Sequence, residues 1–472
     1  MKLHTTITAA LTASTIFTSA AFAGGFDRGG VNIDQLFDAE RYTFDTAVTF
    51  VNPQRTIRNV RRDANVAAPA LIQGGTQQQI ARLIATPGNG INSPADISPA
   101  TLAAIRAGVA QAVAARGTAT SASIDVDSSY TVPRVGIKAG FGDNVACLAS
   151  YTEPFGATAG YGLNNAYSPT SVNFEIDTRD YGLTCSYRFA AGEFSVGQGY
   201  IRAIAGVSYQ ELEGFQSRQT FQDFATAGLT AIPGTGVTNT LGVGTFDVDG
   251  DAFGYRLGVA YEIPEIALRA ALIYHSRYDY DLDGIQDNSG FGAVIPGVFD
   301  VRRNPITLST EIPQAVEVRL QTGLNEKTLA FANFKWQEWS KLDVIPIIGG
   351  RTPVSGQPTN LSFDPRYDDG YTLSGGIGRR LTDDVSALVG IGWDRGTSTV
   401  TGTQTDTYTL SAGLAITPID HLTINVGGLI GRLTDGNSDL PPLTGGDAAN
   451  NLTYEFSDDT VYALSIGAKL KF

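Results

Sequence analysis

The feature that most constrains this 472-residue chain is an alternation of apolar and polar residues that recurs along most of its length. The alternation is cleanest in residues 462–472, where apolar side chains occupy every even position and Ser, Gly or Lys most of the odd ones. In an extended strand, successive side chains point to opposite faces, so one face here is apolar and the other is small or charged. Strands of this kind are typical of outer-membrane barrels, whose apolar face meets lipid.

We therefore predict an all-β fold, a fourteen-stranded antiparallel transmembrane β-barrel with both termini at one end. Short turns alternate with long connections between the strands, and the short turns should lie in the periplasm, with the long connections outside the cell. The predicted strands span residues 41–51, 130–141, 145–162, 171–189, 199–215, 251–263, 266–280, 308–324, 328–342, 368–381, 385–396, 404–417, 421–433 and 455–472.

The chain divides into an N-terminal signal, a short leading segment and the barrel. Residues 1–23 contain Lys2, an apolar run over 7–17 and an Ala-Phe-Ala sequence at 21–23, which together are typical of a cleaved secretory signal peptide. Residues 24–40 then precede the first predicted strand, and the barrel occupies 41–472.

The longest predicted connection, residues 52–129, should carry two helices outside the barrel. The first covers about 77–85, and the second is capped by Ser98, has Pro99 at its first position and stops at Gly117. Two other outer connections, 216–249 and 282–307, are rich in apolar and aromatic residues. Exposed apolar segments often mark a binding surface, although these residues could equally fold into small cores of their own.

The charge of the chain limits its partners. The net charge is −14 and no basic stripe occurs, which argues against nucleic acid. Acidic residues gather at Asp247–Asp251 and Asp279–Asp287, in segments that we place in outer loops. These segments could hold divalent cations, but neither has the full spacing or the terminal glutamate of an EF-hand. We therefore expect solvated loops, with no metal site and no cofactor.

The two cysteines, Cys147 and Cys185, lie almost equally far from the midpoint of the connection between the third and fourth predicted strands. In an unbulged hairpin they would face each other, close enough for a structural disulfide, which the secretory route permits. The apolar residues of the fourth strand, however, change from even positions in 172–176 to odd positions in 181–187. This change indicates a bulge near 178–180 that would spoil the register, so both outcomes stay open.

The sequence contains no motif of a known enzyme class, such as G-x-S-x-G, H-E-x-x-H or a Walker-type loop. His275 and His421 are the only histidines outside the signal, and we interpret both as ordinary polar positions. Barrel phospholipases place a Ser/His pair on the wall, so a barrel does not by itself exclude catalysis. We nevertheless expect a protein that is not an enzyme.

The third predicted strand is interrupted by Pro154, Phe155 and Gly156. Proline has no N–H to donate to the strand ladder, and glycine permits a bend. In a bilayer, the freed backbone groups must be satisfied by protein or by water in a cavity. The interruption therefore predicts a kink in the barrel wall.

Several short blocks of the chain occur together in a familiar order. They are Pro154–Gly156, Pro264–Ala270, Ile312–Val316, Gln321–Gly323, Trp336–Ser340 and Gly376–Arg380. In this order they resemble the FadL-type family (OMPP1/FadL/TodX) of long-chain fatty acid outer-membrane transporters, which also includes aromatic-hydrocarbon channels. The likeness spans nearly the whole mature chain and is closest in character to the branch found in alphaproteobacteria.

The resemblance implies that an N-terminal hatch plugs the barrel. Here the hatch would be residues 24–40, which is shorter than is usual in the family and lacks its Asn-Pro-Ala element. Ligand would be caught on a groove between the third and fourth outer loops, pass to a pocket inside and leave sideways through the kink at Pro154, Phe155 and Gly156. By position, the groove matches Phe221, Phe224, Leu229, Ile232, Phe291, Val294, Ile295 and Phe299. Strand position and inward parity select Arg202, Arg319 and Lys335 to hold a ligand carboxylate.

The expected function is passive uptake of hydrophobic ligands, foremost long-chain fatty acids, across the outer membrane of a Gram-negative cell. The alternatives are an aromatic or alkane hydrocarbon channel, a structural or adhesive surface barrel, and a hydrophilic diffusion porin. Expected partners are the ligand, outer-membrane lipid and lipopolysaccharide, and the barrel-assembly machinery, which would bind the C-terminal Phe472. The protein is expected to be a monomer.

Overall fold

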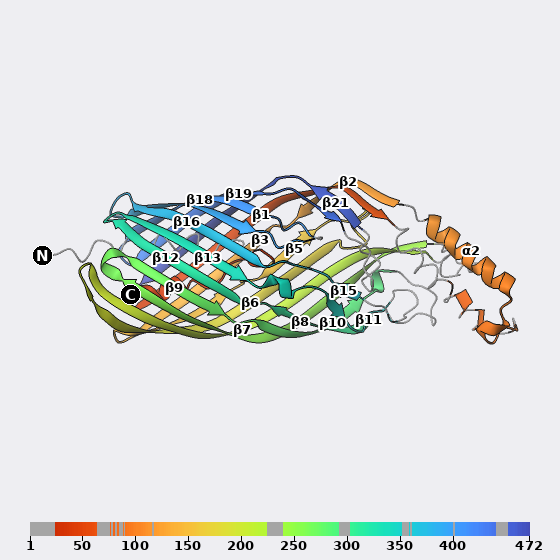
Figure 1. Cartoon of the computed structure of the whole chain (residues 1–472), viewed down its shortest axis with the longest axis horizontal. Coiled ribbons are helices and arrows are strands. Elements are labelled where there is room, and N and C mark those ends of the chain that lie inside the picture. The colour runs from red at the N-terminus through yellow and green to blue at the C-terminus, as the bar shows by residue number, and fades with distance from the viewer. Residues whose placement is uncertain are drawn as a thin grey trace.

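The strands close into one barrel whose axis follows the long dimension of the molecule (Figure 1). The computed structural model describes residues 24–63, 90–115, 118–223, 239–291, 303–351, 361–399, 402–439 and 452–472, with isolated positions between 76 and 88 and at 358. Antiparallel pairing runs through 14 wall strands, and β22 pairs with both β19 and β1, which closes the ring. The predicted fold class is confirmed.

Several wall strands are split into two consecutive elements. The first seven wall strands are β1 (Tyr42–Asp63), β3 (Tyr130–Phe141), β4 (Val145–Thr152) with β5 (Gly156–Gly160), β6 (Asn173–Phe194), β7 (Gly197–Asp223), β8 (Asn239–Ile263), and β9 (Leu268–His275) with β10 (Tyr278–Asp287). The others are β11 (Arg303–Ile312) with β12 (Ala315–Asn325), β13 (Thr328–Gln337), β16 (Gly370–Arg380), β17 (Val385–Arg395), β18 (Thr407–Ile419), β19 (Leu422–Leu433), and β21 (Leu452–Phe456) with β22 (Asp459–Lys471).

The wall has two zones in which the polarity of its faces is reversed, and β8 passes through both. In the membrane zone, Phe253 and Tyr255 are exposed on the outer face, whereas Arg256 is buried in the lumen. Nearer the outer end of β8, Phe246 and Val248 are buried in the lumen and alternate with exposed acidic residues. Lipid surrounds the first zone and water the second, so the apolar face turns from outside to inside.

We define these zones by residue ranges. The membrane zone includes 181–189, 253–261, 385–393 and 408–416, where the exposed side chains are largely apolar. The outer zone comprises 173–178, 212–223, 239–252, 278–287 and 303–312, where apolar side chains such as Leu212, Leu282 and Ile306 form a buried cluster inside the barrel.

The outer zone corrects several predicted strand ends. The connection 52–129 is not a loop throughout, because β1 continues to Asp63 and pairs with β2 (Thr118–Asp127). The strands β7, β8, β10 and β11 likewise extend into the predicted loops 216–249 and 282–307. The acidic segments therefore lie on strands, with Asp279, Asp281 and Asp283 on the exposed face of β10. Apolar and polar residues alternate in these segments with the same period of two as in the membrane strands, but here the polar face is exposed and the apolar face is buried.

The outer end of the barrel also carries the helix predicted from Ser98. This helix, α2 (Pro99–Ala115), lies beyond the end of the barrel (Figure 1). Nowhere in the described residues is a helix both long and apolar enough to cross a membrane. The predicted signal peptide and most of the predicted helix at 77–85 lie outside the described residues.

Small elements complete the described structure. They are the 3-10 turns η2 (Ile33–Phe37), η3 (Pro94–Asp96), η4 (Pro264–Ile266), η5 (Ser289–Phe291) and η6 (Trp339–Lys341), the two-stranded sheet of β14 (Ile345–Ile347) and β15 (Leu361–Phe363), and β20 (Gly436–Asp439), which pairs with β21.

The register of β4 and β6 places Cys147 directly opposite Cys185, and the structure joins them in a disulfide. The predicted bulge near 178–180 in β6 is wrong, because Thr178 and Asp180 are buried in the lumen, on the face from which Phe174 and Ile176 contact the apolar cluster. The apolar residues change parity because β6 passes from the outer zone to the membrane zone, and not because its register shifts.

Candidate functional site: a plugged barrel with an opening in its wall

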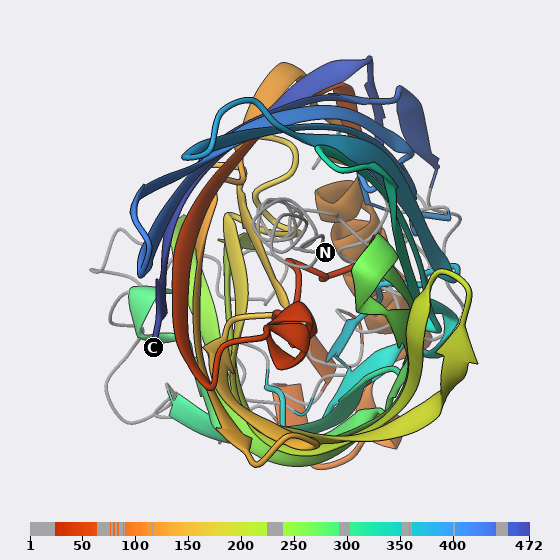
Figure 2. The same ribbon diagram turned by 90° about the vertical axis from the view of Figure 1, so that its left-hand side faces the viewer.

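The N-terminal segment lies inside the barrel, as Figure 2 shows for the red chain within the ring of strands. Its 3-10 turn η2 buries Ile33 and Leu36 against wall residues that include Leu148, Ile204 and Ile273. A buried side chain of this size stabilises by about 1.5–3 kcal/mol relative to an exposed one. Residues 24–40, the predicted hatch, therefore occupy the lumen of the membrane zone.

Acidic residues of the hatch meet basic residues of the wall. Asp34 lies 3.0 Å from Arg269 and 3.3 Å from Arg319, and Asp38 lies 2.6 Å from the buried Lys469. Burial alone would raise the pKa of Asp34, but Arg269 and Arg319 hold that pKa below its usual value. The charges inside the barrel thus fix the hatch to the wall.

The three predicted carboxylate-binding residues all contact this hatch or its neighbours. Arg202 donates to the carbonyl oxygen of Leu36 at 3.2 Å and to Glu262 at 2.9 Å. Arg319 pairs with Glu317 at 2.8 Å as well as with Asp34, and Lys335 pairs with Asp27. In this conformation the hatch and the wall already supply the anionic or carbonyl partners of these residues.

The predicted kink separates β4 from β5. Pairing with β6 runs from Thr152 opposite Asp180 to Gly156 opposite Asp177, so residues 153–155 stand opposite only two residues of β6. The hatch supplies partners for the freed backbone: Arg28 N–H donates to the Pro154 carbonyl at 2.8 Å, and Gly156 N–H donates to the Phe26 carbonyl at 2.7 Å. The hatch is thus hydrogen-bonded to the kink itself.

The kink also detaches strand three from its other neighbour. β3 and β4 pair as far as Arg134 opposite Thr152, and within the described residues no pairing of β3 with β5 follows. A single pair, Asp127 with Gly160, links β2 to the far end of β5. An opening therefore interrupts the hydrogen-bonded wall between residues 130–133 and 153–159, and we call it the wall opening.

The side chain of Arg28 lies in the wall opening. It donates to Asp177 at 2.6 Å and to the hydroxyl of Thr158 at 3.0 Å, and its guanidinium lies 4.4 Å from the ring centroid of Tyr130. These contacts reach both edges of the opening, since Tyr130 belongs to β3 and Thr158 to β5. A Cβ added at Gly156 would collide with the Arg28 guanidinium, so glycine at this position leaves the room that the arginine occupies.

Aromatic packing supports the same region. Trp339 is fully buried, and its ring contacts those of Phe26 and Phe155 at centroid distances of 5.7 and 6.1 Å. Gly25 has a φ of 56°, and a Cβ there would overlap the Trp339 ring. Trp339 thereby positions the start of the hatch against the kink.

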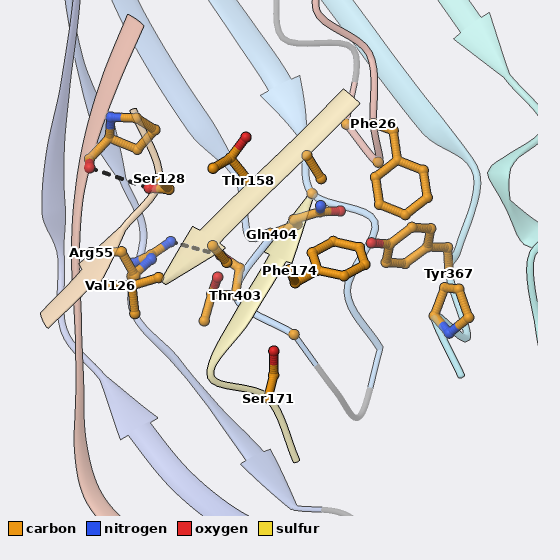
Figure 3. A pocket seen from close by; sticks show the side chains of 18 of the residues that line it. Phe26, Arg55, Val126, Ser128, Thr158, Ser171, Phe174, Tyr367, Thr403 and Gln404 are labelled. Carbon is orange, nitrogen blue, oxygen red and sulfur yellow. Dashed lines mark hydrogen bonds between the residues drawn. The ribbon is translucent and has the colours of Figure 1, made fainter. Parts of the chain in front are cut away.

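Two cavities lie inside the barrel and share three aromatic residues. The larger, about 330 Å³, is bordered by Arg28, Tyr130 and residues 156–159 at the wall opening. The smaller, about 90 Å³, lies within the apolar cluster of the outer zone. Phe26, Phe174 and Phe363 line both, and in Figure 3 the rings of Phe26, Phe174 and Tyr367 lie together on one side of the larger cavity. The two cavities therefore adjoin at these rings, and the larger one borders the wall opening.

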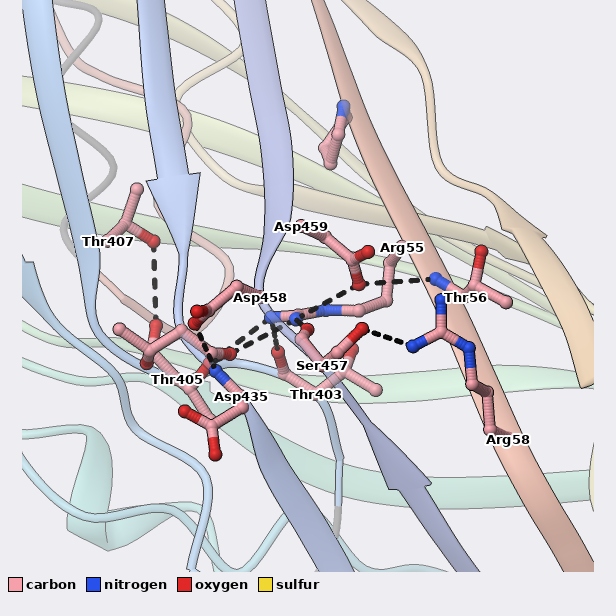
Figure 4. Close-up of polar contacts among 12 residues, drawn as sticks. Arg55, Thr56, Arg58, Thr403, Thr405, Thr407, Asp435, Ser457, Asp458 and Asp459 are labelled. Atoms are coloured by element: carbon pink, nitrogen blue, oxygen red, sulfur yellow. Dashed lines mark hydrogen bonds and ion pairs between the residues drawn. The ribbon is translucent and has the colours of Figure 1, made fainter.

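Arg55 borders the larger cavity, but its guanidinium is engaged in structural contacts (Figure 4). It donates to the carbonyl oxygens of Thr403 at 2.8 Å and Thr434 at 3.1 Å and pairs with Asp459 at 3.4 Å. These groups belong to the segments that flank β18, β19 and β22. Arg55 therefore joins β1 to neighbouring segments at the mouth of the barrel.

The predicted groove residues cannot be placed as a group. Phe224, Leu229, Ile232, Val294, Ile295 and Phe299 lie outside the described residues, and only the backbone is described for Phe221, in β7, and Phe291, in η5. Within the described part of the chain, no cluster of three or more His, Cys, Asp or Glu side chains could hold a metal ion.

Sequence reasoning missed Arg28, Asp177 and Trp339. Arg28 is the only basic residue in 24–40, which was a visible signal, but its partner lies 149 residues further along the chain. Trp339 was noted only as part of a block. No local pattern predicts which strand a hatch residue will meet.

Solved structures of similar fold cover nearly the whole chain. A FadL homologue from Pseudomonas aeruginosa superposes with a TM-score of 0.66 at 15% identity, over 97% of this chain and 98% of that one. The toluene transporter TbuX of Ralstonia pickettii gives a TM-score of 0.55 at 12% identity, over 97% and 100%. The toluene transporter TodX of Pseudomonas putida gives 0.51 at 14%, over 96% and 98%. At these identities the likeness shows the fold alone.

The family follows from the sequence match. Residues 36–435 match the family described as outer membrane protein transport protein (OMPP1/FadL/TodX), and the chain belongs to this family. No curated protein matches the sequence. The protein is an outer-membrane β-barrel transporter of hydrophobic ligands.

Proposed function

We propose that this protein takes up long-chain fatty acids passively, by capture on its outer loops, passage through the lumen and lateral exit at the strand-three kink. The observation that supports the proposal is the pair of adjoining cavities, one within the apolar cluster of the outer zone and the other at the wall opening. A lateral exit releases an amphiphile into the membrane without a water-filled pore. Binding pockets for such ligands are mostly apolar, with a few polar groups that fix orientation.

The lining of the larger cavity favours an amphiphile with an anionic head. Phe26, Phe174 and Phe363 supply an apolar end. Arg28 supplies a cation with an unused Nε donor, and the lining also contains Asp27, Asp364 and Asp394. A neutral hydrocarbon has no group to match the Arg28 donor. A fatty acid has both the chain and the carboxylate.

Uptake measurements test the exit route. Ala157 borders both the cavity and the kink, so Ala157→Trp should fill the route and reduce oleate uptake at least tenfold in a host that lacks its own transporter. Ala149→Trp is the matched control, because Ala149 is exposed on β4. Normal uptake by a correctly assembled Ala157→Trp barrel would contradict lateral exit through this opening.

An aromatic-hydrocarbon channel is the second candidate, because Tyr130, Tyr161, Tyr167, Tyr367 and Tyr454 also line the larger cavity. Aromatic rings pack favourably on one another in offset or edge-to-face geometry. Parallel uptake of toluene and oleate decides between the two. Faster toluene uptake, with oleate at the background rate, would select the hydrocarbon channel.

The capture step is tested separately by deleting residues 224–238, which contain three of the predicted groove residues. We expect weaker oleate uptake at low concentration and normal uptake at saturation, because the lumen route stays intact. Loss of cell attachment without any change in uptake would instead support a surface adhesin. Large ion conductance in planar bilayers would support a hydrophilic porin.

A further inference from the structure

We infer that Arg28 is the latch of the wall opening and the group that receives the carboxylate of the transported acid there. The inference rests on the proposed function and adds a residue and a selection step to it. It starts from a reversal of charge: the hatch presents acids to the wall at Asp27, Asp34 and Asp38, but at Arg28 it presents a base to a wall acid.

Arg28 reaches across the wall from the lumen. On β6 the even residues Thr178 and Asp180 are buried in the lumen, so Asp177 lies on the opposite face. That face also carries Arg179, which pairs with the exposed Glu213. The Arg28 side chain starts in the hatch, is 3% exposed, and ends on the 34% exposed Asp177. It therefore passes through the opening instead of lining it.

Opening the route requires the Arg28 guanidinium to leave this position. The side chain occupies the room beside Gly156 and contacts both edges of the opening, at Tyr130 and Thr158. Its Nε is buried and has no hydrogen-bond partner, so one donor remains available in the closed state. The Arg28 Nε can therefore donate to an oxygen of the ligand while the guanidinium still holds Asp177.

Of the head groups a ligand could carry, a carboxylate displaces Arg28 from Asp177 with the smallest loss of free energy. A buried guanidinium that is left without a partner is strongly destabilising. If the head group of the ligand replaces Asp177, the buried guanidinium keeps a charge-assisted pair, and the released Asp177, which is 34% exposed, is left to solvent. A neutral ester or hydrocarbon offers no such exchange. The wall opening should therefore select acids over esters of the same chain.

The position of the latch suits a departing amphiphile. Tyr151 and Tyr181, whose ring centroids lie 5.3 Å apart, mark the aromatic edge of the membrane zone next to the kink. Asp177 is four residues further out along β6, which corresponds to about 13 Å of strand. A carboxylate held at Arg28 would thus lie at the polar edge of the membrane, with its chain pointing towards the apolar belt.

The test compares oleate with methyl oleate in outer-membrane vesicles from a host without its own transporter. For Arg28→Ala we expect methyl oleate to enter at the wild-type rate or faster, and the oleate-to-ester rate ratio to fall about tenfold, the size of one charge-assisted hydrogen bond. Asp177→Asn should raise both rates and lower the ratio less than Arg28→Ala does, because an ester no longer has to displace an ion pair but Arg28 is still present to receive a carboxylate.

Two controls separate this role from a structural one. Arg179→Ala removes an exposed ion pair two residues away on the same strand and should change neither rate. If Arg28→Ala fails to assemble, the exchange pair Arg28→Asp with Asp177→Arg keeps an ion pair at the opening but removes the cation from the hatch. It should therefore show the same fall in the ratio.

The outcomes are distinct. An unchanged ratio in an assembled Arg28→Ala barrel, or loss of both rates to the level of vesicles without the protein, would overturn the latch. If the wild-type protein moves neither oleate nor its ester above that level, the proposed function fails, whatever the variants do. If the wild-type protein transports oleate and methyl oleate at equal rates, the proposed transport function is supported and carboxylate selection at Arg28 is refuted.

Discussion

The membrane zone and the outer zone are built from the same continuous strands, yet their faces have opposite polarity. In the membrane zone, Leu257 and Val259 are exposed and Arg256 is buried; in the outer zone, Leu282 is buried and Asp283 is exposed. The period of two is unchanged between them. The medium outside the wall differs, because lipid surrounds one zone and water the other. The outward face is therefore apolar in the membrane zone and polar in the outer zone, and the inward face has the opposite character.

This comparison explains where ligand and plug lie. The polar lumen of the membrane zone is filled by the hatch, which is held by Arg269, Arg319 and Lys469. The apolar lumen of the outer zone holds the smaller cavity, and the wall opening lies near the boundary between the two. A change in the parity of apolar residues along a strand therefore marks the edge of the membrane, as it does in β6.

The largest expected effect comes from the tryptophan that joins hatch and kink. Trp339→Ala should cost about 3–5 kcal/mol, because it leaves a large cavity beneath Phe26 and Phe155. Denaturant unfolding and protease cleavage of the hatch measure this loss. Trp393→Ala is the control, since Trp393 is only half-buried, and should cost clearly less. Equal losses would mean that Trp339 has no special role.

The second largest expected effect is the loss of stability caused by a lysine on the lipid-facing side of the membrane zone. Val389→Lys places a charge among exposed apolar residues of the membrane zone and should cost about 2–4 kcal/mol. Ser374→Lys places the same charge at a lumen cavity and should be tolerated. Unfolding in lipid vesicles provides the comparison. If both substitutions cost the same, Val389 does not face lipid.

The reverse experiment applies to the outer zone. Ile306→Asn puts a polar group into the buried apolar cluster and should cost about 1–3 kcal/mol and weaken oleate binding. Thr307→Asn changes the next residue, which is exposed, and should have almost no effect. Binding is measured by fluorescence titration of the purified barrel. A stronger effect at Thr307 would refute the inward assignment of the even positions.

The smallest expected effect is that of pH on the hatch. Because the pKa of Asp34 is held below its ordinary value of 3.8, its ion pairs contribute fully above that value and are lost only as the pH falls through the lowered pKa. The contribution of Asp34 to protease protection of the hatch should therefore be constant from pH 8 to pH 5 and decline below about pH 4. Burial raises the pKa of Asp38, so the contribution of Asp34 is measured as the difference between the wild type and Asp34→Asn. That difference should disappear below about pH 4, because Asp34 is then protonated in the wild type as well. A loss of protection near pH 6 would assign the control to another group.

Much of the fold could be predicted from the sequence because lipid imposes a local pattern. Fourteen strands, the kink at Pro154–Gly156 and the helix from Pro99 follow from alternation, proline chemistry and capping residues. The outer strand ends were wrong because the pattern there changes polarity. The bulge assigned to 178–180 was wrong for the same reason.

The site was less accessible to sequence reasoning. The kink was found because it breaks a local rule, whereas Arg202, Arg319 and Lys335 were selected by parity, which places a side chain in the lumen without naming its partner. The carboxylate role of these three residues stays a prediction. Tertiary structure brings each of them to the hatch.

The sequence by itself determined that this chain forms a membrane barrel whose third strand is broken at Pro154–Gly156, because strand periodicity and the geometry of proline act over a few residues. Only the tertiary structure decided what fills the break. Arg28 and Asp177 lie 149 residues apart and meet because the hatch folds back through the closed barrel. Such a pairing depends on the whole ring of strands, and so no local pattern could specify it.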